Sequence, residues 1–143
     1  GIDALVGRTT RVHNDLDVSI DSGSLDRALD VVDALGFEVV TDWLPVRVAV
    51  RDKTGREIDI HPIVFETDGS AWLPDLEGGR FTYPAESFTT GTIDGRDVPC
   101  ISTELQLAFH RGYRLMDKDR ADIRALQAAG LIDGRVADEM CAE

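Results

Sequence analysis

The sequence has few cysteines and no long apolar runs. Its two cysteines, Cys100 and Cys141, are far apart and form no Cys-x-x-Cys pair, so neither structural zinc nor a disulfide framework is expected. No apolar run approaches the roughly 18 residues typical of a membrane span, and no signal peptide is visible. We therefore expect no membrane partner and a location in the reducing cytoplasm.

Basic residues are also scarce. Fifteen Lys and Arg stand against 27 Asp and Glu, which gives a net charge of −12. Such a surface repels nucleic acid phosphates, and no local basic patch is visible, so nucleic acid is not an expected partner. The acidic field favours small cationic molecules, although a surplus of carboxylates also simply keeps a protein soluble.

The hydrophobic pattern predicts an α+β domain in which helices pack on a mixed or antiparallel sheet. With 143 residues, 43% of them hydrophobic, the chain suits a single domain. A stretch that contains several Gly and Pro residues, 66–87, is expected to be a long loop and a candidate lid or substrate-contacting segment. Strands are expected at 15–20, 37–41, 46–51, 57–61, 88–93 and 96–101, and helices at 1–7, 24–35, 102–110 and 118–129.

Two carboxylates lie two residues apart on the first expected strand. Because side chains alternate along a strand, Asp15 and Asp17 point to the same face, while Leu16 and Val18 are expected to point into the core. Adjacent carboxylates repel each other unless a cation lies between them, and Mg²⁺ prefers oxygen ligands. The pair alone is a weak signal, because Asp-x-Asp is common on solvated strands.

Asp59 is a third candidate carboxylate, between Ile58 and Ile60 on another expected strand. If it meets the first pair across the sheet, three carboxylates suit phosphoryl or nucleotidyl transfer, and one of them could take the proton of the attacking hydroxyl. An ion pair from Asp59 to Arg47 or Arg51 on the neighbouring strand fits the pattern equally well. The sequence leaves both interpretations open.

Cations and histidines flank these carboxylates. Arg8 and Arg11 could offset the charge of a bound triphosphate, or could pair with Asp3 or with the aspartate cluster. His13 and His61 lie beside carboxylates, where a single histidine more often supports its neighbour by hydrogen bonding than acts in catalysis.

Further candidates for substrate contact are His110 and Tyr113 on the expected helix 102–110 and just after it, and the two tryptophans, Trp43 and Trp72. Each fits a role in lining a pocket or stacking on a substrate. Ordinary packing explains each of them as well.

Taken together, the first motifs resemble the signature of the antibiotic nucleotidyltransferases. That block reads Gly1-Ile2-Asp3-Ala4-Leu5-x-Gly7-Arg8-x-Thr10-Arg11-x-His13-x-Asp15-x-Asp17. Downstream blocks are similar to those of the small lincosamide nucleotidyltransferases. They are Asp42-Trp43-Leu44-Pro45-x-Arg47, Ile58-Asp59-Ile60-His61-Pro62-Ile63, Val98-Pro99-Cys100-Ile101-Ser102, Gln106-Leu107-x-Phe109-His110-x-Gly112-Tyr113 and Asp119-x-x-Asp122-Ile123.

This resemblance implies a polymerase-beta-like nucleotidyltransferase fold and Mg²⁺-dependent transfer of AMP from ATP to an antibiotic hydroxyl. Asp15 and Asp17 would then bind the metal, and Asp59 would be a third ligand or the general base. Candidate nucleotide-binding residues are Arg8, Thr10 and Arg11; candidate acceptor contacts are His13, Trp43, His61, His110 and Tyr113.

The resemblance favours a lincosamide as the acceptor. An aminoglycoside modified at its 2''-hydroxyl, another acceptor, or a degenerate non-catalytic domain are the alternatives. The resemblance also implies a homodimer. The family has a helix and a Gly-Gly turn before its first motif, so 1–143 is expected to be a single domain that begins just past that turn.

Overall fold

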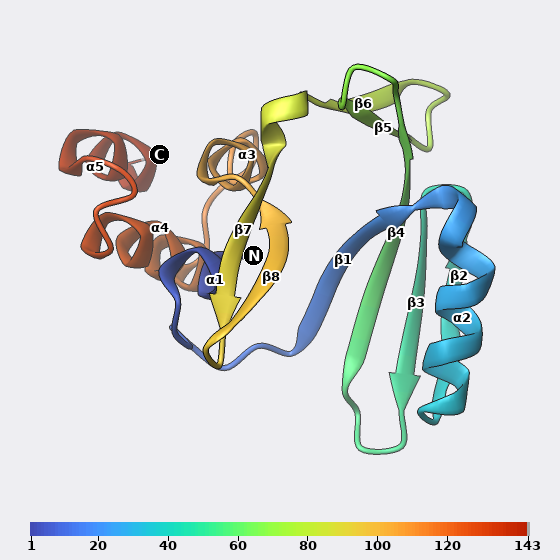
Figure 1. The fold of residues 1–143 in the computed structure, drawn as a ribbon. Coiled ribbons are helices and arrows are strands. Elements are labelled where there is room, and N and C mark those ends of the chain that lie inside the picture. Colours follow the sequence, from blue (N-terminus) through green and yellow to red (C-terminus); the bar gives the residue numbers. More distant parts are fainter. Residues whose placement is uncertain (143) are drawn as a thin grey trace. The chain divides into compact units, whose positions relative to one another are not determined.

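The computed structural model describes residues 1–142, and its fold is α+β as predicted (Figure 1). The chain divides into two compact units. One consists of 13–85, and the other combines 1–12 with the chain from 86 onward. No helix within 1–142 is long and apolar enough to cross a bilayer.

The unit formed by 13–85 is built on a mixed six-stranded sheet (Figure 1). Five strands follow the order β2-β3-β4-β5-β6 with antiparallel neighbours, and β1 pairs with β4 in parallel. Helix α2 packs against β2. The elements are β1 (Asp15–Asp21), the 3-10 turn η1 (Ser22–Ser24), α2 (Leu25–Ala34), β2 (Phe37–Trp43), β3 (Arg47–Asp52), β4 (Glu57–Phe65), β5 (Ala71–Pro74) and β6 (Arg80–Tyr83).

The prediction of a structureless loop over 66–87 is wrong, because this stretch contains the β5–β6 hairpin. Two of its glycines, Gly78 and Gly79, lie in the tight turn between these two strands. The Asp75 carboxylate accepts the backbone N–H groups of Glu77 and Gly79 there. Ala71 and Tyr83, opposite each other in the hairpin, are buried.

Two expected core positions are also wrong. Leu16 is 51% exposed, because β1 is paired on one side only and so lies at the edge of the sheet, while Val18 is half-buried. Leu35, whose spacing in the expected helix 24–35 matches that of its other apolar residues and so predicts a core position, is 66% exposed just beyond the helix end.

The other unit packs four helices with a two-stranded hairpin. Asp94 and Gly95 form the turn of that hairpin, as predicted, and Ser102 caps α3 by accepting the N–H of Leu105 at 3.3 Å. The elements are α1 (Ile2–Val6), the 3-10 turn η2 (Ala85–Ser87, at the boundary), β7 (Phe88–Ile93), β8 (Arg96–Ile101), α3 (Thr103–Phe109), α4 (Asp117–Ala128) and α5 (Gly134–Ala142). Its apolar core comprises Ile2, Leu107, Leu115, Ile123, Leu126, Ala137 and Met140.

Helix α1 lies directly against β7, and Gly91 permits this contact. A Cβ atom at Gly91 would lie 2.4 Å from the backbone oxygen of Ala4, far inside van der Waals contact. Because the obstructing atom is backbone, no side-chain rotation relieves the clash. The approach of α1 to the hairpin therefore depends on glycine at this position.

We expect Gly91→Ala to destabilise this unit by about 1–3 kcal/mol, the usual cost of overpacking. Thr89→Ala, at an exposed position of the same strand, serves as the control and should change stability by less than about 0.5 kcal/mol. Urea unfolding measured for both variants checks this. Equal midpoints would show that α1 does not need the close approach.

The turn between β3 and β4 is organised by Asp52. Its carboxylate accepts the backbone N–H groups of Thr54 and Arg56, and the side chains of both residues also donate to it. Desolvation raises the pKa of Asp52, but these hydrogen bonds outweigh it and lower the pKa from 3.8 to about 2. The ionised form therefore holds the turn that leads into β4.

A depressed pKa contributes stability that is fully present above the unfolded value near 3.8 and is lost as pH falls toward 2. We expect the free energy of unfolding to fall less steeply between pH 4 and pH 2 in Asp52→Asn than in the parent. Asp30→Asn, at an exposed position of α2, controls for the loss of one charge. Parallel pH profiles for the parent and Asp52→Asn would contradict this account of the turn.

Candidate active site

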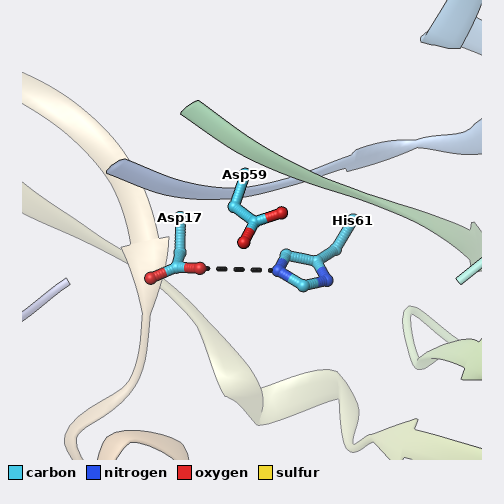
Figure 2. A group of neighbouring side chains, drawn as sticks. All are labelled: Asp17, Asp59 and His61. Carbon is cyan, nitrogen blue, oxygen red and sulfur yellow. Dashed lines mark ion pairs between the residues drawn. The ribbon is translucent and has the colours of Figure 1, made fainter. Parts of the chain in front are cut away.

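Parallel pairing of β1 with β4 brings the candidate carboxylates together. In this register Asp17 lies opposite Asp59, and His61 follows two residues later on the same face of β4. One ligand atom from each of the three lies within 4.8 Å of the others (Figure 2). The Nε2 atom of His61 is 3.5 Å from the Oδ1 atom of Asp17.

Asp59 is the buried member of this group. Asp59 is 7% exposed, and its Oδ2 atom forms an ion pair with Nη1 of Arg47 at 3.1 Å. Its other oxygen, Oδ1, is buried and has no hydrogen-bond partner among residues 1–142. Desolvation raises the pKa of Asp59, against the opposing influence of the charges on Arg47 and His61.

Asp17 has the opposite environment, because its side chain is 70% exposed. A hydrogen bond with His61 is the main reason why the pKa of Asp17 is lowered. Asp15 lies one alternation before it, opposite Glu57, and is exposed. The three converging side chains thus include His61 rather than Asp15, whose role as a metal ligand stays a prediction.

These residues fit a divalent cation. A buried carboxylate oxygen without a partner is costly, and a cation supplies the missing interaction. Asp17 and Asp59 offer the oxygen ligands that Mg²⁺ prefers, and His61 offers a nitrogen beside them. The ion pair to Arg47, which the sequence left as an alternative to metal binding, exists, but it occupies one oxygen of Asp59 only.

Trp43 lies on the same face of the sheet, because it pairs with Arg47 across β2 and β3. The guanidinium carbon of Arg47 is 4.9 Å from the centre of its ring. Trp43 remains 52% exposed, so one part of this aromatic surface is open to solvent near the carboxylates. A contact between Trp43 and an acceptor stays a prediction.

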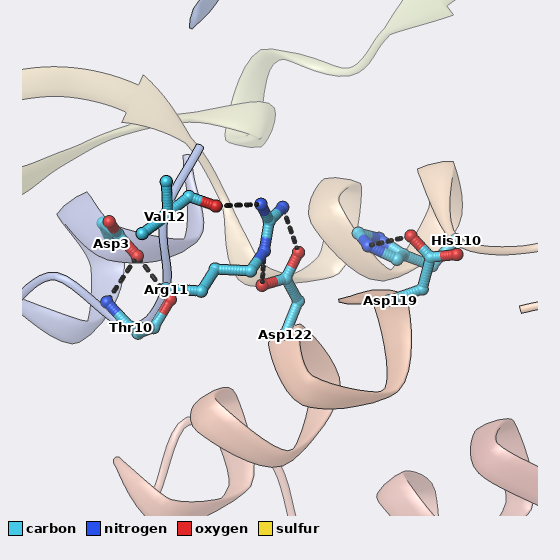
Figure 3. A network of polar contacts seen from close by, with 7 residues as sticks. All are labelled: Asp3, Thr10, Arg11, Val12, His110, Asp119 and Asp122. Atoms are coloured by element: carbon cyan, nitrogen blue, oxygen red, sulfur yellow. Dashed lines mark hydrogen bonds and ion pairs between the residues drawn. The ribbon is translucent and has the colours of Figure 1, made fainter. Parts of the chain in front are cut away.

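The candidate nucleotide-binding residues Arg8, Thr10 and Arg11 belong to the other unit. Arg11 donates from Nε and Nη2 to the two carboxylate oxygens of Asp122, both at 2.9 Å (Figure 3). Thr10 donates its backbone N–H to Asp3 at 3.0 Å, and its hydroxyl donates to the same oxygen. Arg8 is exposed. Their contact with a nucleotide stays a prediction.

His110 and Tyr113 gather around Asp119 in this second unit. The Nδ1 atom of His110 lies 2.7 Å from the carbonyl oxygen of Gln106, and Nε2 is 4.0 Å from Asp119 (Figure 3). Desolvation, and next the charge of Asp119, raise the pKa of Tyr113. His13 is exposed in the unit that carries the carboxylates. Contact between these residues and an acceptor stays a prediction.

Sequence reasoning overlooked the structural part that two carboxylates of α4 play. Asp122 is 3% exposed and holds Arg11, while Asp119 is 5% exposed and accepts the N–H of Met116 at the start of α4. Their spacing of three, next to the buried Ile123, was the available signal. It places both on the buried side of one helix.

Comparison with known proteins agrees with this geometry. A family model described as aminoglycoside-2''-adenylyltransferase matches residues 1–126. The chain belongs to this family. It is 33% identical over 128 residues to a lincosamide resistance protein of Staphylococcus haemolyticus. The matched region covers 90% of this chain and 80% of that protein.

The fold of this chain is also similar to solved structures. The lincomycin-bound crystal structure of the lincosamide antibiotic adenylyltransferase LnuA matches with a TM-score of 0.81 and 32% identity, covering 90% of this chain and 81% of LnuA. The solution structure of the antibiotic-resistance factor ANT(2'')-Ia matches with a TM-score of 0.70 and 20% identity, covering 99% and 75% of the two chains, and supports the fold alone.

The Arg11–Asp122 ion pair should stabilise this family member measurably. Asp122→Asn leaves Arg11 without its counter-ion, and we expect a loss of about 1–2 kcal/mol, less than for a fully buried pair because the Arg11 side chain is 29% exposed. Asp138→Asn, which breaks the exposed pair with Arg124, is the matched control and should cost less than about 0.5 kcal/mol. Chemical unfolding compares them; equal losses would show that burial adds nothing here.

Proposed function

We propose that this chain transfers AMP from ATP to a hydroxyl group of a small antibiotic and releases pyrophosphate, with Mg²⁺ bound at its carboxylates. The observation that carries the proposal is the register that sets Asp17 beside the buried Asp59, in a chain of this adenylyltransferase family. A lincosamide is the first acceptor to test, because the curated relative at 33% identity is a lincosamide resistance protein.

In the proposed reaction the hydroxyl oxygen of the acceptor forms a bond to the α-phosphorus of ATP. The bond from that phosphorus to the bridging oxygen of the leaving pyrophosphate breaks. Asp59 takes the hydroxyl proton, and its raised pKa makes it a better base than an exposed carboxylate. This step needs no oxidant or reductant, and the acceptor hydroxyl is its nucleophile.

Asp15, Asp17 and Asp59 are the proposed metal ligands. Bound Mg²⁺ would neutralise charge on the phosphate oxygens and orient the triphosphate. Arg8, Thr10 and Arg11 are the proposed nucleotide contacts, for which Arg11 would have to share or exchange its present partner, Asp122.

On the acceptor side we propose the residues His13, Trp43, His61, His110 and Tyr113. The half-open ring of Trp43 supports stacking or apolar contact with a sugar or alkyl group. The net charge of −12 favours an acceptor with a protonated amine. We also propose that the protein acts as a homodimer in the cytoplasm, where ATP is abundant.

An aminoglycoside is the second candidate acceptor, because the matching family model is described by 2''-adenylyl transfer to that class. A non-catalytic binding domain is less well supported. The buried Asp59 oxygen that has no hydrogen-bond partner among residues 1–142 costs stability unless a ligand completes it, and a degenerate domain that binds neither metal nor nucleotide would have no such ligand.

The test is to incubate the protein with ATP, Mg²⁺ and either lincomycin or tobramycin, and to look by mass spectrometry for an acceptor heavier by one AMP unit. We expect product with lincomycin. Asp17→Asn and Asp59→Asn should each lower kcat by about 10²-fold or more, as loss of a metal ligand or general base does.

Asp21→Asn, which removes a carboxylate from the same strand four residues further on, is the matched control and should retain parental kcat. Product with tobramycin alone would transfer the proposal to aminoglycosides. Absence of product with both, or full activity of Asp59→Asn, would overturn the proposed use of these carboxylates.

A further inference from the structure

Arg47 holds one oxygen of the buried Asp59. It lies on β3, whose Ala49 is paired with Asp59 on β4, and residues two apart share a face of the sheet. Nη1 of Arg47 forms an ion pair with Oδ2 of Asp59 at 3.1 Å, and Oδ1 is the oxygen without a hydrogen-bond partner among residues 1–142. The carboxylate is therefore divided into one occupied and one open oxygen.

One carboxylate oxygen of Asp59 belongs to the group formed with Asp17 and His61. In Figure 2 the Asp59 carboxylate lies beside the line that joins Asp17 to His61. A buried anionic oxygen without a donor nearby is unfavourable, so this position is poised for a cation or a donated proton. The occupied oxygen is not available to either.

Arg47 is itself held in place. Its guanidinium lies 4.9 Å from the centre of the Trp43 ring, and the Arg47 side chain is 29% exposed. Stacking on the ring restricts rotation of the planar group, which a lysine ammonium would not experience in the same way. The orientation of the Asp59 carboxylate is thus fixed through Arg47 by a residue of a third strand, β2.

We infer that Arg47 is a positioning residue for Asp59: by occupying Oδ2 it presents Oδ1 alone to the metal and to the acceptor hydroxyl. This inference rests on the proposed nucleotidyl transfer. In this role the Arg47–Asp59 pair weakens the binding of a free cation but supports turnover. An ion pair that only stabilises the fold would not have these two opposite effects.

The charges around the site predict that loss of Arg47 strengthens cation binding. Asp15, Asp17 and Asp59 carry three negative charges, and Arg47 offsets one of them. Removing the guanidinium makes the site more negative and frees Oδ2, so a divalent cation should bind more tightly, and could bind through both oxygens of Asp59. Without the guanidinium the Asp59 carboxylate can rotate, so Oδ1 is no longer held toward the acceptor hydroxyl and turnover should fall.

The experiment measures binding of Mn²⁺ alone to the nucleotide-free protein by electron paramagnetic resonance, and separately measures kcat and KM. In Arg47→Met we expect Mn²⁺ to bind about 3- to 10-fold more tightly. We expect kcat to fall about 10-fold or more, with a change in KM for ATP of less than about threefold. Loss of a merely structural contact would weaken Mn²⁺ binding or leave it unchanged.

A matched control lies four residues further along the same strand, on the same face of the sheet. Arg51 pairs with Glu57, its Nε atom lying 2.8 Å from the carboxylate of that residue. Arg51→Met also removes one positive charge and one cross-strand ion pair, but Asp59 keeps its partner. We expect kcat to stay at the parental value and Mn²⁺ affinity to rise by less than about twofold.

Two further variants keep the inference testable if Arg47→Met does not fold. Arg47→Lys retains the charge but not the planar fork, so Mn²⁺ affinity should stay within about twofold while kcat falls about fivefold. In an Asp59→Asn background, Arg47→Met should tighten Mn²⁺ binding by less than about twofold, because only the loss of a positive charge remains and the oxygen it frees is neutral.

Unchanged or weaker Mn²⁺ binding in Arg47→Met, or parental kcat in Arg47→Lys, overturns the positioning role. These outcomes are distinct from failure of the proposed function. That failure would show as Mn²⁺ binding that is insensitive to Asp17→Asn in the parent, or as absence of adenylylated product from the parent itself.

Discussion

The parallel pairing of β1 with β4 is the interaction on which the candidate site depends. A parallel register aligns every second residue of the two strands on one face, so Asp17 meets Asp59 only if this register is kept. A slip by one residue would turn Asp17 away from Asp59. The hydrophobic residues on the other face, such as the buried Ile60, oppose that slip because it would expose them.

The two carboxylates that meet in this register differ in environment, and the difference suits two tasks. Asp59 is buried and has its pKa raised by desolvation, whereas Asp17 is exposed and has its pKa lowered by its hydrogen bond with His61. A carboxylate that stays ionised suits metal binding, and one with a raised pKa suits proton transfer. Arg47 belongs to the same arrangement, because it keeps Asp59 from being wholly uncompensated.

Much of the fold was predictable from local pattern. The strand at Asp15–Asp21, the helix after Ser24, the hairpin around Asp94 and Gly95, and the helix capped by Ser102 all follow period and turn chemistry. The β5–β6 hairpin was missed because its strands have four residues each, too short to show a period among turn residues. Exposure of Leu16 was missed because an alternating pattern does not reveal whether a strand lies at a sheet edge.

The sequence by itself identified the residues that we propose carry chemistry, the Asp-x-Asp pair and Asp59, and it contained the ordered motifs that place the chain in its family. Only the tertiary structure decided which of them meet. The converging group contains His61 in place of Asp15. One oxygen of Asp59 pairs with Arg47, and the other has no hydrogen-bond partner among residues 1–142. The physical reason is that alternation along a strand is local, whereas strand order, register and burial arise from contacts between segments distant in sequence.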